Sequence, residues 1–206
     1  MTAPAEPRTD RGRSTKYRLL AAAEADMLEH GRIEVTRVAE RADASLGLLY
    51  RYFDNKDRLV VAVVDRFYDR YEEAVFAVPA PPESRWLEHE WQRIEREVAF
   101  LFEEPLARRL VGGTPIEPAA AYADAGRLAQ HIALAARNIE HGQHRGEISS
   151  AVDPTLAAAA IIGGLRACLA TALTEESKTR PDEVVETMMR ISAAIISSVE
   201  ANHVTN

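Results

Sequence analysis

Apolar residues recur every three or four positions along most of the chain, which is the spacing of one face of an α-helix. In residues 56–78, for example, such a stripe is formed by Leu59, Val63, Phe67, Tyr71, Ala74 and Val78. Alternating apolar runs joined by Asn-Gly or Asp-Gly turns, the usual signal of β-hairpins, do not occur in the sequence. The pattern predicts an all-α fold with about nine helices.

Glycine, proline and capping residues set the expected ends of these helices. Gly31 suits the end of the first helix, Asn55 suits the N-cap of the fourth, and Pro154 and Pro181 suit first turns. We expect helices at residues 14–30, 36–42, 46–52, 56–78 and 83–103, a short helix after Pro105, and further helices at 118–142, 154–173 and 181–200.

The second and third predicted helices, with a three-residue turn between them, have the dimensions of a helix-turn-helix. Val38, Ala39 and Ala42 give the first of the two a small apolar face, against which its partner can pack closely. Ser45 is placed to cap the next helix, and Leu49 and Phe53, four positions apart, are placed to anchor it.

The remaining side chains of this helix are expected to lie near its outer side, and they are Leu46, Gly47, Leu48, Tyr50, Arg51 and Tyr52. Tyrosine hydroxyls, together with the ammonium group of Lys56, can bind phosphate oxygens. Glycine permits close approach of the backbone, and leucine can contact thymine methyl groups. The pattern indicates a DNA-binding surface.

Residues 17–60 resemble the DNA-binding domain of TetR-family transcriptional regulators. The matching positions are Leu20 to Ala23, Gly31, Thr36, Val38, Ala39, Ala42, Ser45, Gly47, Leu49, Tyr50, Tyr52, Phe53, Asn55, Lys56 and Leu59. The resemblance implies that Thr36, Ser45, Tyr50, Tyr52 and Lys56 contact phosphates. It also implies that Leu46, Gly47, Leu48 and Arg51 face base edges.

Two positions depart from the family pattern. Asp43 replaces the usual glycine of the turn, and aspartate can still adopt a left-handed backbone. Leu48 replaces a small hydroxyl residue, so we expect base specificity to depend more on apolar contact and on DNA shape.

The net charge of the 206 residues is −7, which taken alone argues against a nucleic-acid partner. The charge is unevenly distributed, however, because residues 1–58 hold 11 basic and 10 acidic residues whereas residues 59–206 hold 14 and 22. We therefore expect a DNA-binding domain at 1–58 and an acidic regulatory and dimerisation domain at 59–206. Residues 1–16 are expected to be a flexible basic arm, which either contacts DNA or is a solvated tail.

Several features limit the other classes of function. Cys168 is the single cysteine, which excludes an internal disulfide and suggests a reducing cytoplasm. The start of the chain lacks the apolar core of a secretory signal, and apolar runs such as residues 156–162 are short for a membrane span. No catalytic motif, phosphate loop or dinucleotide fingerprint occurs, so we expect no enzyme and no cofactor. His141 and His144 flank Gly142 at an expected helix end, where a metal site is a weaker interpretation than a favourable dipole interaction.

The last two predicted helices indicate a self-association surface. Residues 157–160, 163 and 164 are all alanine or glycine, and the helix at 181–200 has a broad apolar face. We expect a homodimer through residues 154–200, which would present two recognition helices to a palindromic operator. An internal core helix is the alternative.

The resemblance also implies a small-molecule pocket in the middle of the chain. Its candidate residues are Phe67, Tyr71, Trp86, Trp91, Arg127 and His131. The predicted function is therefore a repressor that a small-molecule effector releases from double-stranded DNA. The alternatives are a ligand-independent DNA-binding regulator or activator, and a helical small-molecule-binding protein with a vestigial DNA-binding domain.

Overall fold

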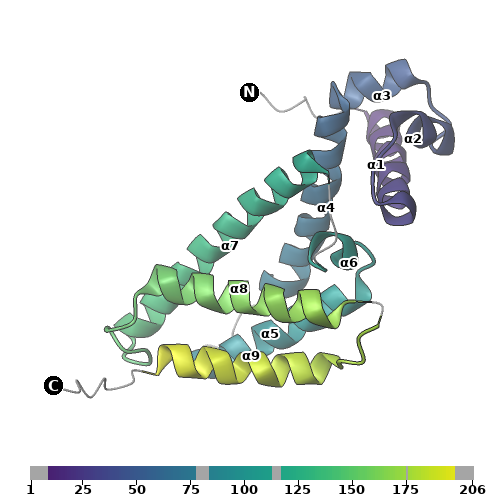
Figure 1. The fold of residues 1–206 in the computed structure, drawn as a ribbon. Helices are drawn as coiled ribbons and strands as arrows, with labels where there is room; N and C mark the ends of the chain where they lie inside the picture. The colour runs from purple at the N-terminus through teal and green to yellow at the C-terminus, as the bar shows by residue number, and fades with distance from the viewer. Residues whose placement is uncertain (1–8, 78–83, 113–116, 175, 198–206) are drawn as a thin grey trace. The chain divides into compact units, whose positions relative to one another are not determined.

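The computed structural model describes residues 9–77, 84–112, 117–174 and 176–197, which form nine helices and no strand (Figure 1). The predicted all-α fold is therefore confirmed. In chain order the helices are α1 (Asp10–His30), α2 (Val35–Arg41), α3 (Leu46–Phe53), α4 (Lys56–Phe76), α5 (Trp86–Glu103), α6 (Ala107–Leu110), α7 (Pro118–His144), α8 (Pro154–Ala172) and α9 (Pro181–Ile196).

The first helix begins four residues earlier than its apolar stripe predicts. The Thr9 side chain accepts a hydrogen bond from the Gly12 N–H at 3.2 Å, and Asp10 supplies an acidic residue to the first turn. Residues 10–16 are consequently helical, which corrects the prediction of a flexible arm over residues 1–16. Residues 1–8 of that predicted arm, Val78 of the predicted apolar stripe, and residues 198–200 of the last predicted helix lie outside the described residues.

Packing divides the chain into two compact units. The first unit comprises Met1–Tyr71 and Glu104–Gly126, and the second comprises Glu72–Glu103 and Arg127–Asn206. The division falls within α4 and within α7, so each of these helices contributes to both units. The boundary predicted at residue 58 separates a DNA-binding domain from a regulatory domain by function and not by packing, and it stays a prediction.

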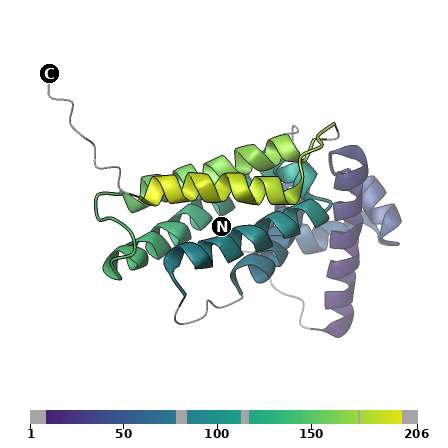
Figure 2. The ribbon, with the colours of Figure 1, turned by 90° about the horizontal axis from the view of Figure 1, so that it is seen from below.

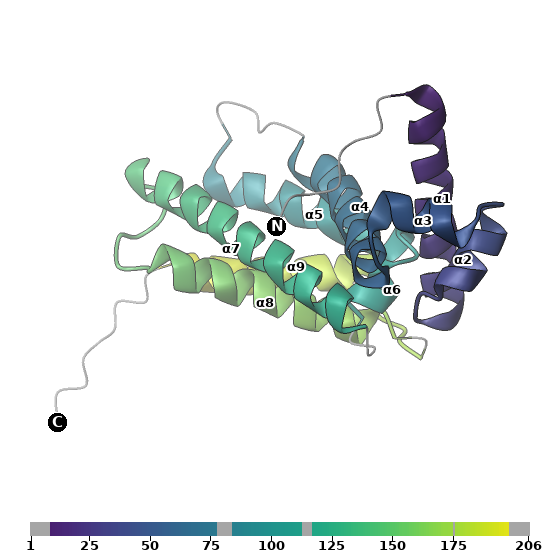
Figure 3. The same cartoon turned by 90° about the horizontal axis from the view of Figure 1, so that it is seen from above.

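The core of the first unit is built from the inward faces of α1 to α4. Within it α2 packs against both α1 and α3, and the three helices lie together in Figure 3. The fully buried side chains here include Leu19, Val38, Leu49, Phe53, Leu59 and Val63. Burying aliphatic and aromatic side chains of this size is the main contribution to the stability of such a core.

The second unit has a core drawn from α5, α7, α8 and α9 (Figure 2). Helix α9 packs against both α5 and α8, which explains why its apolar face is broad. Val184, Val185, Met188, Met189 and Ile196 are buried by these two neighbours within the chain. The breadth of this face is therefore not evidence for a second chain, and the exposed side of α8 carries that argument instead.

Helix α8 is also, among the described helices, the one that is long and apolar enough to cross a membrane. The sequence analysis predicted this helix but did not recognise its length in apolar residues, because glycine and Arg166 interrupt the larger apolar side chains. Ala158, Leu165 and Leu169 on one side of α8 are buried, and the helix packs against α9. This is the arrangement of a core helix, so α8 does not indicate a membrane protein.

A buried carboxylate joins three elements of the first unit. Asp26 of α1 is 1% exposed and accepts hydrogen bonds from the Glu34 N–H at 2.7 Å and from Arg37 Nε at 2.7 Å. His30 Nδ1 lies 3.0 Å from the same carboxylate. Burial raises the pKa of Asp26, but the hydrogen bonds from Arg37 and Glu34 outweigh it, so the pKa lies below its ordinary value. The charged form of Asp26 therefore stabilises the fold.

We expect Asp26→Asn to lower the free energy of unfolding at pH 7 by about 2 kcal/mol, because Arg37 loses its buried partner. Since the pKa is lowered by folding, the contribution of Asp26 is present above the ordinary carboxyl value and is lost as the pH falls below about 4. Urea unfolding between pH 7 and pH 3 should show a flatter acid dependence for the variant. Asp43→Asn, at an exposed aspartate, is the control, and an equal loss in both variants would contradict this role.

Candidate nucleic-acid interface

Helix α3 is held in place by two buried side chains and one cap. Leu49 and Phe53 lie one turn apart and are 0% and 1% exposed. Ser45 has an extended backbone, and its Oγ accepts a hydrogen bond from the Leu48 N–H at 3.1 Å. The anchors and the cap are therefore those that the sequence predicts.

The turn between α2 and α3 has a left-handed residue at the position where glycine is usual in the family. The backbone φ of Asp43 is 46°, as expected for an aspartate that replaces glycine. The Ala44 N–H donates to the Ala39 carbonyl at 2.9 Å and closes the turn. This departure from the family pattern thus leaves the helix-turn-helix geometry intact.

The side of α3 opposite the anchors is open to solvent. Leu46 and Tyr50 are each 40% exposed, and a Cβ added at Gly47 would meet nothing within 4 Å. The predicted DNA-binding residues of α2, α3 and the start of α4 are exposed at Thr36, Ser45, Leu46, Gly47, Tyr50 and Arg51, and half-buried at Leu48, Tyr52 and Lys56. The fold therefore gathers on one short segment a row of side chains that a groove can reach.

Most guanidinium groups of α2 are used to attach this helix to α1. Arg41 donates to Glu29 at 2.8 and 2.5 Å, and this hydrogen bonding holds the pKa of Glu29 below its ordinary value. Arg37 is paired with Asp26 and Glu34. Arg51 of α3 differs, because its guanidinium carbon lies 5.8 Å from the ring centroid of Tyr52 on the exposed side of the helix. The guanidinium groups of α2 are thus engaged within the chain, whereas that of Arg51 lies on the exposed side of α3.

Lys56, predicted to bind phosphate, forms an ion pair with Glu117 within the first unit. The same carboxylate accepts a hydrogen bond from the Ile33 N–H, just before α2, at 2.9 Å. The Glu117 side chain is 16% exposed and that of Lys56 is 43% exposed. Sequence reasoning missed Glu117, because no periodic pattern connects residues so far apart in the chain. If Lys56 binds phosphate as the sequence predicts, Glu117 would compete for its ammonium group.

The predicted ligand-binding residues are shared between the two units, with Phe67 and Tyr71 in the first and Trp86, Trp91, Arg127 and His131 in the second. Phe67 and Tyr71 are buried in the first unit on either side of Tyr68, with ring centroids 5.0 and 5.9 Å from that of Tyr68. The Tyr68 hydroxyl donates to the buried carboxylate of Asp124. These rings form an aromatic core around a satisfied polar pair.

Arg127 and His131 meet at Glu72 in the second unit. Arg127 donates to Glu72 Oε1 at 3.0 Å, and His131 Nε2 lies 3.0 Å from the same oxygen. His131 is 5% exposed, and its ring centroid is 5.7 Å from that of Phe76. Glu72 was not predicted, yet it is the residue that brings the two predicted ones together.

The two tryptophans have different environments within the second unit. Trp86 is 6% exposed, its Nε1 donates to the Asn138 carbonyl at 3.2 Å, and it packs against Gly142, where an added Cβ would lie 2.9 Å from the ring. Trp86 is therefore a core residue. Trp91 is 41% exposed and lines a surface groove.

Two further carboxylates of α5 are buried and were also missed. Arg93 donates to Glu90 at 2.9 and 2.8 Å and also pairs with Glu97. Glu90 and Glu97 are seven residues apart, on the same helix face as the buried Ile94. This spacing is visible in the sequence, and it could have shown that both carboxylates lie on the buried face of the helix. Among the described residues, no group of His, Cys, Asp and Glu side chains is arranged to hold a metal ion, and His141 and His144 lie in the last turn of α7.

Residues 19–63 match the sequence model of bacterial regulatory proteins of the tetR family, which covers most of α1, all of α2 and α3 and the start of α4. Residues 19–63 therefore form a DNA-binding domain of the tetR family. The match contains every predicted DNA-binding residue from Thr36 to Lys56. No curated protein has a significantly similar sequence.

Solved structures share the fold over most of the chain. The fatty acid degradation regulator FadR from Bacillus halodurans is 16% identical with a TM-score of 0.71, covering 95% of this chain and 99% of its own. SmeT, the repressor of the Stenotrophomonas maltophilia multidrug efflux pump SmeDEF, is 18% identical with a TM-score of 0.72, covering 89% and 91%. AibR, solved in complex with isovaleryl coenzyme A and operator DNA, is 15% identical with a TM-score of 0.63, covering 86% and 97%. These structures therefore share the fold of this chain well beyond residues 19–63.

We expect Glu117→Gln to raise the affinity for DNA about threefold, because Lys56 no longer has to leave a partly exposed ion pair. The amide oxygen can still accept the Ile33 hydrogen bond, so the fold should be preserved. Binding at fixed salt should be measured for Glu117→Gln, Lys56→Ala and the double variant as a cycle. If Glu117→Gln raises affinity equally when Lys56 is absent, the effect is one of net charge and the proposed competition is wrong.

Proposed function

We propose that this TetR-family regulator is a sequence-specific repressor, which binds a palindromic operator as a homodimer and is released by a small molecule. The observation that carries the proposal is the exposed face of α3. A capped helix offers Leu46, Gly47, Tyr50 and Arg51 to solvent, while Leu49 and Phe53 hold it from behind.

The chemistry of this face divides into two parts. Tyr50, Tyr52 and Lys56, with the hydroxyls of Thr36 and Ser45, would bind phosphates and set the position of the helix in the major groove. Leu46, Leu48 and Arg51 would meet base edges, and the open space in front of Gly47 would admit the DNA closely. Because few bases are read through polar contacts, DNA shape would contribute to specificity.

The direct test is a selection from random double-stranded DNA, followed by binding measurements at several salt concentrations. We expect a palindromic sequence to be enriched. Lys56→Ala should weaken binding about tenfold, and should reduce the slope of log K against log salt by about one, because one phosphate contact is lost. Tyr50→Ala should also weaken binding.

Tyr122→Ala is the matched control, because Tyr122 is 83% exposed on α7 and lies outside the proposed surface. Unchanged affinity of the Tyr50 and Lys56 variants, with their association state intact, would exclude this surface. A selection without any enriched sequence would contradict specific recognition.

The homodimer is proposed to form through the outer side of α8. Exposed positions recur along it at Leu156, Ala160, Gly163, Ala167 and Thr171, a spacing of three and four residues. Leu156 is 71% exposed, and the small residues that follow would let a second helix approach closely. Two copies related by a two-fold axis would form a four-helix interface from α8 and α9 and would present two recognition helices.

Gly163→Glu should convert the dimer into a folded monomer. An added Cβ at Gly163 would meet nothing within 4 Å of the chain itself, so the charge should disturb only a second copy. Gly126→Glu is the matched control, since Gly126 is also helical, exposed and free of contacts within 4 Å. Sedimentation velocity distinguishes the outcomes, and a Gly163→Glu variant that stays dimeric would contradict the proposed interface.

Release by a small molecule is supported by the polar groups inside the second unit and by the printed descriptions of similar folds. Glu72, Arg127 and His131 form one partly buried cluster, and Glu90, Arg93 and Glu97 form a more deeply buried one. AibR was solved with both isovaleryl coenzyme A and operator DNA. A ligand near these groups would displace α4, which continues from Lys56 to Phe76, and would change the separation of the two recognition helices from the roughly 34 Å that DNA requires. Ligand and DNA would then oppose each other through one coupling free energy.

The regulator is further proposed to act in the cytoplasm on chromosomal DNA and to catalyse no reaction. The acidic residues 59–206 would repel DNA, so binding would depend on the few contacts made by α2, α3 and Lys56. We therefore infer a shallower salt dependence than that of a uniformly basic DNA-binding protein.

A further inference from the structure

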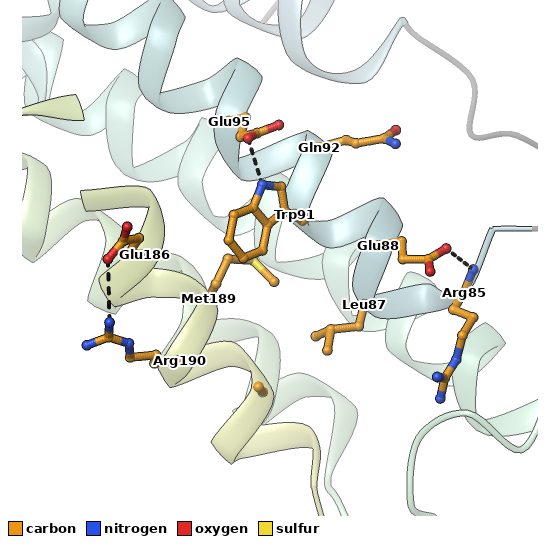
Figure 4. A pocket seen from close by; sticks show the side chains of 10 residues that line it. Arg85, Leu87, Glu88, Trp91, Gln92, Glu95, Glu186, Met189 and Arg190 are labelled. Atoms are coloured by element: carbon orange, nitrogen blue, oxygen red, sulfur yellow. Dashed lines mark hydrogen bonds and ion pairs between the residues drawn. The ribbon is translucent and has the colours of Figure 1, made fainter. Parts of the chain in front are cut away.

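A surface groove runs between α5 and α9 within the second unit (Figure 4). Its volume is about 930 Å³, which is enough for a drug-sized molecule. None of the predicted DNA-binding residues lines it. The lining residues are Arg85, Leu87, Glu88, Trp91, Gln92 and Glu95 from α5 and the segment before it, and Glu186, Met189, Arg190 and Ala193 from α9.

Trp91 is the largest side chain in the groove and is 41% exposed. Its Nε1 donates to Glu95 Oε1 at 2.6 Å, so its single polar group is satisfied and what it still offers a ligand is the face of its ring. In Figure 4 the ring lies between Glu95 on its own helix and Met189 of α9. Met189 is 5% exposed, and together with Leu87 and Ala193 it supplies the other apolar side chains of the lining.

Two carboxylates share the helix face of Trp91 on α5. Glu88 and Glu95 lie three residues before and four residues after Trp91, which is the spacing of neighbours on one helix face. An aromatic face attracts a cation, and a carboxylate beside the ring, here that of Glu95, strengthens that attraction. The same ring face offers no hydrogen-bond donor to an anion.

The charges of the groove agree with this assignment. It has three carboxylates, from Glu88, Glu95 and Glu186, against two guanidinium groups, from Arg85 and Arg190. Arg190 is paired with Glu186 at 3.4 Å at the exposed edge. Glu88 accepts a hydrogen bond from the Arg85 N–H at 3.1 Å, and Glu95 is the carboxylate beside the ring (Figure 4). We propose that the groove binds an organic cation with an apolar body, stacked on Trp91 beside Glu95. This site is separate from the proposed DNA surface, and its occupancy does not depend on the regulator binding an operator.

The test uses the full chain without DNA and tetraphenylphosphonium as the probe, with tetraphenylborate as an anion of the same shape. Equilibrium dialysis should give one phosphonium bound per chain, with an affinity at least about tenfold higher than that of the borate. Quenching of tryptophan fluorescence should follow the same curve, because Trp91 is exposed whereas Trp86 is buried. Equal binding of the two ions would overturn the proposal, because the groove would then be only an apolar surface.

Variants assign the binding to the groove. Trp91→Leu should weaken phosphonium binding about tenfold, and Glu95→Gln, whose amide oxygen can still accept from Trp91, should weaken it about threefold. Glu103→Gln removes the same charge from the exposed end of the same helix and should leave binding unchanged. Unchanged binding in Trp91→Leu would overturn the proposal. Failure of the native chain to bind the probe would also overturn it. If Trp91→Leu then alters the association state of the protein, the groove is instead an interface between copies.

Discussion

A helix of eight residues is too short to be stable in water by itself, so α3 exists as a helix because Leu49 and Phe53 are buried beneath it. This constraint determines which side chains are available for recognition, since two of its eight positions must face the core. It also requires a firm platform, which Asp26 provides by holding the end of α1, the backbone before α2 and Arg37 at one buried carboxylate. The exposed face of α3 is therefore a consequence of how the core beneath it is packed.

Ion pairs within the chain reduce the number of basic groups in residues 1–58 that are available to a partner. Residues 1–58 carry a net charge of only +1, and Arg37, Arg41 and Lys56 are paired with carboxylates of the chain. The composition of this region thus overstates the positive charge that is available to a partner. The proposed DNA recognition would depend on hydroxyl groups, helix ends, close approach and Arg51 to a greater degree than the count of basic residues suggests.

The sequence predicted the helices because they follow from local spacing, and the predicted DNA-binding residues, which also rest on local spacing, stay a prediction. Helical periodicity and the positions between Thr36 and Lys56 need no knowledge of distant parts of the chain. The start of α1 was missed because its cap, Thr9, precedes the apolar stripe. Glu117 and Glu72 were missed for a different reason, since their partners Ile33 and His131 are 84 and 59 residues away, and such pairs arise only from tertiary packing.

The two tryptophans illustrate the limit of inference from residue type. Both are on α5, five positions apart, and their side chains are chemically identical. Five positions correspond to a rotation of about 140° around a helix, so two such residues cannot face the same neighbour. Trp86 meets the small residue Gly142 of α7 and becomes part of the core, whereas Trp91 meets the edge of α9 and keeps an exposed ring. The identity of the neighbouring helix, and not the aromatic side chain itself, therefore decides which tryptophan supports the fold and which one is available to a ligand.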